Sequence, residues 1–136
     1  MSSPVLFAHP SSNFTEICRL FFEIGIHHLP VLTKRGKLVG MISATDVLRT
    51  FAYQIPLLEK KDVESINQTF QVAEIMTPMP LHVIGPDDTV MSAANRFSRF
   101  KIHALPVVEK EELVGIITAN DLLESLASSE ERLRFV

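Results

Sequence analysis

The chain contains two pairs of near-identical stretches. Ile26-His27-His28-Leu29-Pro30-Val31 returns as Ile102-His103-Ala104-Leu105-Pro106-Val107, with five of the six positions identical. Leu38-Val39-Gly40-Met41-Ile42 returns in the same way as Leu113-Val114-Gly115-Ile116-Ile117. Because both stretches recur in the same order, about 75 residues apart, the chain is an internal tandem repeat.

A third pair, Ser43-Ala44-Thr45-Asp46-Val47-Leu48 and Thr118-Ala119-Asn120-Asp121-Leu122-Leu123, follows the second directly. Apolar runs and turn residues predict the order strand, helix, strand, strand, helix in each repeat. The strands are expected at 5–8, 29–32 and 38–42, and at 81–84, 105–108 and 113–117. The helices are expected from Ser11 or Ser12 to Gly25, from 44 to 53, from Asp87 or Asp88 to Lys101, and from 119 to 127. In the second helix of each repeat, the side chains expected inward are Val47, Leu48, Phe51, Leu122, Leu123 and Leu126.

The predicted fold class is α+β, with two β-α-β-β-α repeats packed through their sheets as a pseudo-two-fold pair. The strand runs are almost wholly apolar, which is typical of strands that are covered on both faces. The expected organisation is repeat 1 at 1–56, a helical or irregular linker at 57–71, and repeat 2 at 72–136.

Composition excludes several classes of protein. The 136 residues are 46% hydrophobic and 21% charged, which is typical of globular proteins. The formal net charge of −3 argues against tight nucleic-acid binding. The single cysteine, Cys18, has no partner for an internal disulfide. No apolar run is long enough to cross a bilayer, so we expect a soluble, cytoplasmic protein.

The repeated motif Gly-x-x-[Ser/Thr]-x-x-Asp suits a sugar phosphate. Gly40 and Gly115 let a ligand approach the backbone, since they have no Cβ. Ser43 and Thr118 place a hydroxyl beside a helix N-terminus, which favours anions. Asp46 and Asp121 can accept hydrogen bonds from the two hydroxyls of a ribose. The alternative interpretation is a helix cap, in which the Ser or Thr caps and the Asp completes a capping box.

These residues, together with Glu74-Ile75-Met76-Thr77-Pro78, resemble a tandem pair of cystathionine-β-synthase-type (CBS) domains, modules that commonly bind adenine nucleotides. The resemblance spans nearly the whole chain. It implies ligand clefts between the repeats, with Asp46 and Asp121 holding ribose. The residues implied near ribose or phosphate are Ser43, Thr118, His27, His28 and His103. The apolar or backbone positions implied in the clefts are Gly40, Gly115, Pro30, Pro106, Thr77 and Pro78.

One position departs from the family pattern. In the regulatory subunit of AMP-activated kinase, a member of this family, the run Ile-His-Arg-Leu-Pro supplies a His and an Arg to phosphates. His27 and His103 match that His, but the Arg position is His28 in one repeat and Ala104 in the other. Since Arg pairs bidentately with phosphate, we expect monophosphate or uncharged adenosyl ligands to bind better than ATP. The two clefts should also differ in affinity.

Three other readings compete. A metal site could be built from His27, His28, His103 and His82, although the spacing guarantees no tetrahedral set. A second alternative is an enzyme, but the sequence contains no nucleophile and base pair, no phosphate-binding loop and no redox cofactor motif that would indicate one. The repeats could also form a ligand-independent dimerisation or interaction scaffold.

The preferred interpretation is a non-enzymatic regulatory module. It would bind AMP, ADP, ATP or S-adenosylmethionine, need no cofactor or metal, form a homodimer and signal to a separate effector protein in trans.

Overall fold

The structure, a computed structural model, describes residues 6–79 and 81–128. Two compact units divide the chain: one runs over Leu6–Leu81 and the other begins at His82. The division into compact units falls after Leu81, whereas the second repeat was expected to begin at residue 72. The repeat boundaries remain a prediction.

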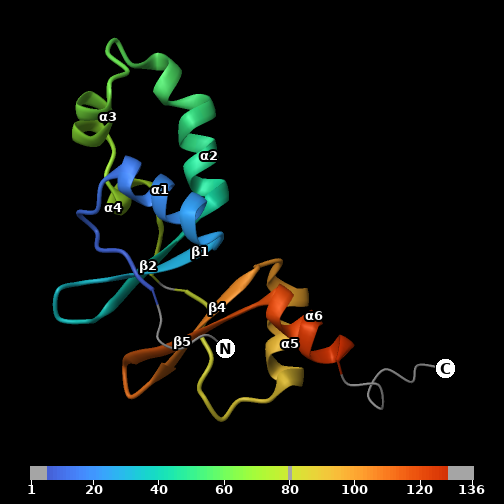
Figure 1. The fold of residues 1–136 in the computed structure, drawn as a ribbon. Helices are drawn as coiled ribbons and strands as arrows, with labels where there is room; N and C mark the ends of the chain where they lie inside the picture. The colour runs from blue at the N-terminus through green and yellow to red at the C-terminus, as the bar shows by residue number, and fades with distance from the viewer. Residues whose placement is uncertain (1–5, 80, 129–136) are drawn as a thin grey trace. The chain divides into compact units, whose positions relative to one another are not determined.

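The first unit holds four helices, one 3-10 turn and three strands among its described residues (Figure 1). In chain order they are α1 (Phe14–Ile24), β1 (His28–Leu32), β2 (Leu38–Ser43), α2 (Ala44–Tyr53), the 3-10 turn η1 (Ile55–Leu57), α3 (Val63–Thr69), α4 (Val72–Ile75) and β3 (Thr77–Pro78). Figure 1 shows α2 leading away from the end of β2. The second unit holds α5 (Val90–Phe100), β4 (Ala104–Glu109), β5 (Glu112–Thr118) and α6 (Ala119–Ala127).

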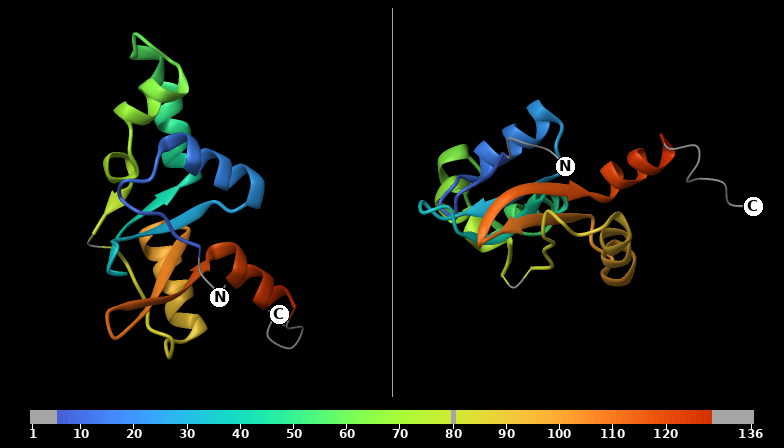
Figure 2. Two further views of the ribbon diagram at one scale, coloured as in Figure 1. Left: turned by 60° about the vertical axis from the view of Figure 1, so that its left-hand side comes forward. Right: turned by 90° about the horizontal axis from the view of Figure 1, so that it is seen from below.

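Each unit is built on an antiparallel hairpin. In the first, β1 pairs with β2 so that His28 lies opposite Ser43, and β3 extends the sheet by pairing with β2. In the second, β4 pairs with β5 so that Ala104 lies opposite Thr118, and β5 leads directly into α6 (Figure 2). The mixed α+β class and the hairpin-then-helix order of each repeat are therefore confirmed.

The hairpin turns of the two units differ. In the first, Gly36 adopts φ 83°, which a glycine accepts without strain. In the second, Lys110 and Glu111 adopt φ 50° and 67°. The shorter second turn therefore places two non-glycine residues in the left-handed region.

The first strand predicted in each repeat is wrong as a strand over the described residues. Ala8 forms a single parallel bridge with Val31, and Ile84 forms the equivalent bridge with Val107. Two backbone hydrogen bonds hold each bridge. The amide of Ala8 donates to the carbonyl of Pro30 at 2.9 Å, and the amide of Leu32 donates to that of Ala8 at 2.8 Å. In the second unit, the amide of Ile84 donates to Pro106 at 3.0 Å and that of Val108 to Ile84 at 2.8 Å. Val5, at the start of the predicted strand, lies outside the described residues. Conversely, Thr77 and Pro78 form the short strand β3, which was not predicted.

Two helix starts also differ from the prediction. The cap of α1 is Asn13 rather than Ser11 or Ser12, and Ser12 Oγ instead accepts a hydrogen bond from the amide of His9. The cap of α5 is Thr89, whose hydroxyl accepts from the amide of Ser92, whereas Asp88 accepts from the amide of Gly85. The expected stop at Gly25 is confirmed, because this residue closes α1 in the left-handed conformation.

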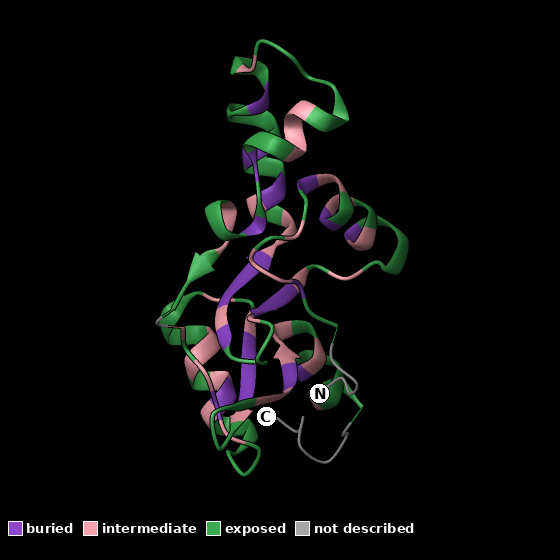
Figure 3. Cartoon of the chain, turned by 90° about the vertical axis from the view of Figure 1, so that its left-hand side faces the viewer, coloured by how far each residue is buried: buried purple, intermediate pink, exposed green. Residues whose placement is uncertain are grey.

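Each unit has its own apolar core, centred on the hairpin and one face of its helices (Figure 3). Val47 and Leu122 point inward as predicted, with 7% and 6% exposure. The same prediction is wrong for Leu48, Phe51 and Leu123, which are exposed. These helices carry apolar residues on more of their circumference than the core covers.

The segment that joins the repeats belongs structurally to the first unit. Phe70 and Val72 are buried in the core of that unit. The helix α3 within this segment is capped by Asp62, and hydrogen bonds from Ser65 hold the pKa of the Asp62 carboxyl below its usual range. The linker is therefore partly helical, one of the two forms expected from its sequence.

Candidate functional site

The candidate ribose-binding aspartate of the first repeat lies in the first turn of α2. The backbone amide of this residue, Asp46, donates a hydrogen bond to Ser43 Oγ at 3.1 Å. Asp46 Oδ2 accepts a hydrogen bond from the Ser43 amide at 2.9 Å. These two bonds form a complete capping box. The capping interpretation of Asp46 is therefore confirmed.

The second repeat has the same arrangement at the start of α6. The amide of Asp121 donates to Thr118 Oγ1 at 3.0 Å, and Asp121 Oδ2 accepts from the Thr118 amide at 3.0 Å. Capping occupies one lone pair of one oxygen in each carboxylate, whereas an ionised carboxylate offers about four acceptor sites. A cap and a second ligand for the same side chain are therefore compatible.

The surroundings of the remaining oxygen differ between the repeats. Arg49 Nη1 lies 3.4 Å from Asp46 Oδ1, with the Asp46 side chain 14% exposed and that of Arg49 62% exposed. The residue equivalent to Arg49 in the second repeat, at the same helical offset from Asp121, is Glu124. Neither residue was predicted from the sequence to belong to the site.

The structure brings the histidine segment to the cap in each unit. The amide of Ala44, the first residue of α2, donates to the carbonyl oxygen of His27 at 2.9 Å. The amide of Ala119 donates to the carbonyl of His103 at the same distance. Since His28 is also the cross-strand partner of Ser43, the first unit groups His27, His28, Ser43 and Asp46 at one end of its hairpin. The second unit groups His103, Thr118 and Asp121.

Gly40 has a structural reason to lack a side chain. A Cβ at this position would lie 2.6 Å from Met76 Sδ and 2.7 Å from the carbonyl oxygen of Thr77. Gly40 pairs with Pro78 across β2 and β3, so Thr77 and Pro78 lie beside it. The space over Gly40 is therefore taken by the chain itself, and a ligand approach at this glycine remains a prediction.

The other apolar candidates lie within the strands. Pro30 and Pro106 are among the largest fully buried side chains, in β1 and β4. Gly115 is buried in β5 opposite Val107. These three residues support the hairpins on which the capping residues are carried, and their placement in a ligand cleft remains a prediction.

No group of three or more metal-ligating side chains comes together among residues 6–79 and 81–128. His82, one of the histidines considered for such a site, instead stacks on Phe100 with ring centroids 4.0 Å apart. In the same part of the chain, no helix is long and apolar enough to cross a membrane.

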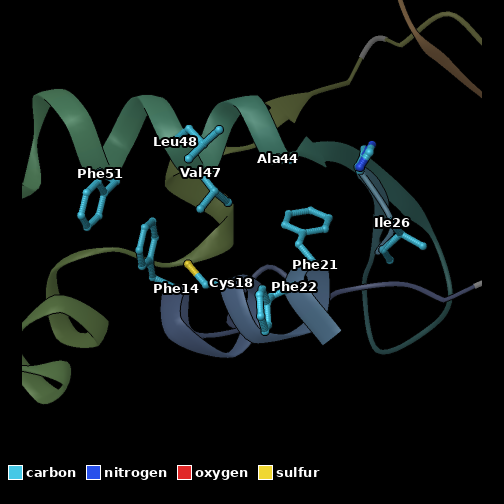
Figure 4. A pocket seen from close by; sticks show the side chains of 10 residues that line it. Phe14, Cys18, Phe21, Phe22, Ile26, Ala44, Val47, Leu48 and Phe51 are labelled. Atoms are coloured by element: carbon cyan, nitrogen blue, oxygen red, sulfur yellow. The ribbon is translucent and has the colours of Figure 1, made fainter. Parts of the chain in front are cut away.

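An apolar groove lies between α1 and α2 of the first unit (Figure 4). Its volume is about 420 Å³. It is lined by Phe14, Cys18, Phe21, Phe22, Ile26, His27, Ala44, Val47, Leu48 and Phe51. Burial raises the pKa of the Cys18 thiol, which keeps this side chain neutral and compatible with apolar neighbours.

This groove was not predicted, although the sequence contains a signal for it. Phe22 lies directly after the inward-facing Phe21, and Leu48 directly after Val47. Consecutive apolar residues on a helix point to different faces, so they indicate a second apolar surface beyond the core.

Two α+β repeats, each with a hairpin that leads into a helix capped by a hydroxyl residue and an aspartate, define a tandem-repeat module. The sequence matches the CBS domain over residues 1–53 and 72–128, and the chain belongs to the CBS domain family. The resemblance stated from the repeated motifs is confirmed.

Solved CBS domain pairs share the fold. The pair of protein MJ0100, in complex with 5′-methylthioadenosine and S-adenosyl-L-methionine, matches with a TM-score of 0.78 and 26% identity. The match covers 94% of this chain and 92% of that one. The protein CBSX2, in complex with AMP, matches with a TM-score of 0.74 and 25% identity, over 92% and 89% of the two chains.

Two relatives in sequence differ in how much of their length this chain covers. The uncharacterized protein MJ1426 of Methanocaldococcus jannaschii is 30% identical to this chain. The match covers 93% of this chain and 88% of MJ1426. The inosine-5′-monophosphate dehydrogenase of Korarchaeum cryptofilum is 38% identical over 87% of this chain, but the chain spans only 21% of that enzyme. This chain therefore matches most of the first relative and only a small part of the second.

Proposed function

We propose that this chain is a non-enzymatic regulatory module that binds an adenosine-type ligand through Asp46 and Asp121. The observation that carries the proposal is the second oxygen of each aspartate, which lies beside a helix N-terminus and is not used by the cap. The MJ0100 and CBSX2 pairs, which hold adenosyl compounds, support the same ligand class.

The chemistry of the two helix starts suits such a ligand. A carboxylate accepts hydrogen bonds from both hydroxyls of a ribose, while the exposed amides of a helix N-terminus attract a phosphate. The Ser43 and Thr118 hydroxyls and the histidine segments lie at the same helix starts. We expect AMP and uncharged adenosyl compounds to bind better than ATP, because His28 and Ala104 stand where an Arg would bind further phosphates.

Thermal unfolding with added ligand tests the proposal. A ligand that binds only the folded state stabilises it by about 2.7 kcal/mol at about a hundredfold excess over Kd. AMP, ADP, ATP, S-adenosylmethionine and 5′-methylthioadenosine should be compared, with cytidine monophosphate as the control for the base. A rise in Tm for adenosyl compounds alone is expected, and no shift with any of them would contradict ligand binding.

Paired substitutions separate ribose binding from capping. Asp46→Ala and Asp121→Ala remove both functions and should cost about 1 kcal/mol each in unfolding free energy, because the cap is lost. Asp46→Asn and Asp121→Asn keep one carbonyl oxygen for the Ser43 or Thr118 amide, so they should cost less. Both kinds of variant should lose the ligand-induced shift at the altered site. A full shift in the double Asn variant would overturn the role of the carboxylates.

We further propose that the module is a homodimer that signals to an effector protein in trans. The apolar groove between α1 and α2, with Phe22, Leu48 and Phe51 exposed around it, supports a protein contact at this surface.

The same groove favours the second candidate function, a scaffold that assembles without any ligand. The two candidates differ in their response to ligand. A regulatory module should change its affinity for a partner or for a second copy when the adenosyl compound is added, since coupling between two sites is reciprocal. A scaffold should show neither a change in Tm nor a change in assembly.

A further inference from the structure

The two candidate ribose sites carry opposite charges at one matched position. Arg49 lies three residues after Asp46, and Glu124 lies three residues after Asp121. Both residues are exposed on the first two turns of the helix that begins at the cap. The exchange of Arg for Glu alters the local charge by two units at otherwise similar helix starts.

In the first repeat this residue reaches the aspartate. Arg49 Nη1 lies 3.4 Å from Asp46 Oδ1, the oxygen that the cap leaves open. The guanidinium keeps further donors beyond the one directed at Asp46. It can therefore pair with a second anion next to this carboxylate without leaving its place.

In the second repeat, the charged side chains of α6 are Asp121 and Glu124, and both are acidic. Residues three apart on a helix lie on one face, so Glu124 adds its charge to that of Asp121. A phosphate entering there would meet two carboxylates, opposed by the same helix N-terminus that both repeats possess.

The opposite strand strengthens the contrast. His28, a residue that can carry a positive charge, is the cross-strand partner of Ser43, whereas Ala104 is the partner of Thr118. Cross-strand partners have side chains on the same face of the sheet. Both differences make the first site the more favourable one for an anion.

We propose that Arg49 and Glu124 give the two sites different ligand preferences. The site at Asp46 takes an adenosine compound that carries a phosphate, and the site at Asp121 takes an uncharged or cationic adenosyl compound, such as a thioether or a sulfonium. This inference rests on the proposed function, because it assigns ligands to the same two aspartates.

Binding calorimetry on single-site proteins tests the assignment. Asp121→Asn leaves the first site and Asp46→Asn leaves the second. AMP and 5′-methylthioadenosine serve as the ligands, since they share adenosine and differ at the 5′ substituent. The ratio of their Kd values should favour AMP in the first protein and 5′-methylthioadenosine in the second.

Charge exchange on these backgrounds should move the ratio. Arg49→Gln should lower the preference for AMP by about fivefold to tenfold, the effect of one unit charge several ångströms away in a partly solvated site. Arg49→Glu should reverse the preference, and Glu124→Arg should create a preference for AMP at the second site. Arg19→Glu on α1, whose side chain is 78% exposed and paired with Glu23, makes the same change in net charge elsewhere and should leave the ratio unchanged.

The possible failures are distinguishable. If neither compound binds the unaltered protein, the proposed function fails and this inference fails with it. If both compounds bind but their ratio is the same at the two sites, or Arg19→Glu shifts it as much as Arg49→Glu, the inference is overturned while the proposed function stands.

Discussion

Asp46 and Asp121 each have two carboxylate oxygens, and the helix uses one of them. In both repeats Oδ2 accepts a hydrogen bond from the amide of the cap residue, Ser43 or Thr118. This bond fixes the direction of the carboxylate before any ligand arrives, which lowers the entropy lost on binding. Under the proposed function, capping and ribose binding are therefore compatible uses of one side chain.

Gly40 is a residue at which a single methyl group should be costly. We expect Gly40→Ala to lower the unfolding free energy by about 1–3 kcal/mol, because its Cβ would lie 2.7 Å from a backbone oxygen that has little room to move. Urea unfolding would measure the change.

Gly85→Ala is the matched control, since its Cβ would meet nothing closer than 3.8 Å. Its unfolding free energy should change little. Equal losses in the two variants would show that the contact with Thr77 is not the cause.

The motif Gly-x-x-[Ser/Thr]-x-x-Asp predicted that the hydroxyl residue and the aspartate lie together at a helix start, but not every contact that its residues make. The strands at 29–32 and 38–42 were predicted, but the register that pairs His28 with Ser43 was found only in the structure. The role of Gly40 did not follow, because Met76 and Thr77 reach it from more than thirty positions away in the sequence. Arg49 was missed since a charge on an exposed helix face is usually a solvated one.

Among the elements, the second hairpin has an unfavourable turn. Lys110 and Glu111 both have positive φ, a conformation that glycine adopts with less strain. We expect Glu111→Gly to raise the unfolding free energy by about 0.5–1 kcal/mol, since the relief of strain exceeds the added entropy of the unfolded chain. Chemical denaturation would measure it.

The neighbouring residue supplies the control for that turn. Glu112 begins β5 and has no positive φ, so Glu112→Gly should weaken the hairpin by about 0.5–1 kcal/mol. A loss of stability in both variants would contradict the assignment of strain to Glu111.

The central hairpins and the helices that follow them could be predicted because their signals are local. Apolar runs of strand length end at a hydroxyl cap in both repeats, and the helix begins at the next residue. The single bridges at Ala8 and Ile84 could not be predicted, since an apolar segment of strand composition becomes a strand only where a neighbour offers a long enough edge. The caps of α1 and α5 shifted by one or two residues, where several polar residues adjoin.

For the whole molecule, assembly should depend on the groove between α1 and α2. We expect Phe22→Glu to weaken the proposed homodimer by at least tenfold, because it places a charge on a side chain that is 86% exposed in the single chain. Light scattering after size-exclusion chromatography, over a range of concentrations, would measure the change.

Leu57→Glu is the control for this surface. Leu57 is 83% exposed in η1 and does not line the groove, so its substitution should leave the mass unchanged. A monomeric unaltered protein, or equal weakening by both substitutions, would contradict the proposed interface.

The order of the repeats was visible in the sequence, whereas the point at which the chain divides into units was not. The repeat pattern places the second copy from residue 72 onward, yet Val72 is completely buried in the first unit. Packing that crosses a repeat boundary leaves no periodic signal, because it connects residues that are not equivalent in the two copies.

The burial of Phe70 and Val72 has a consequence for the gene as well as for the protein. A crossover or an expression fragment that ended at residue 56 would discard two buried side chains of the first core, together with the strand that pairs with Gly40. An autonomous half would have to extend through residue 81. A single copy that is cut at the boundary of the duplicated unit is therefore expected to be less stable than one that extends through residue 81.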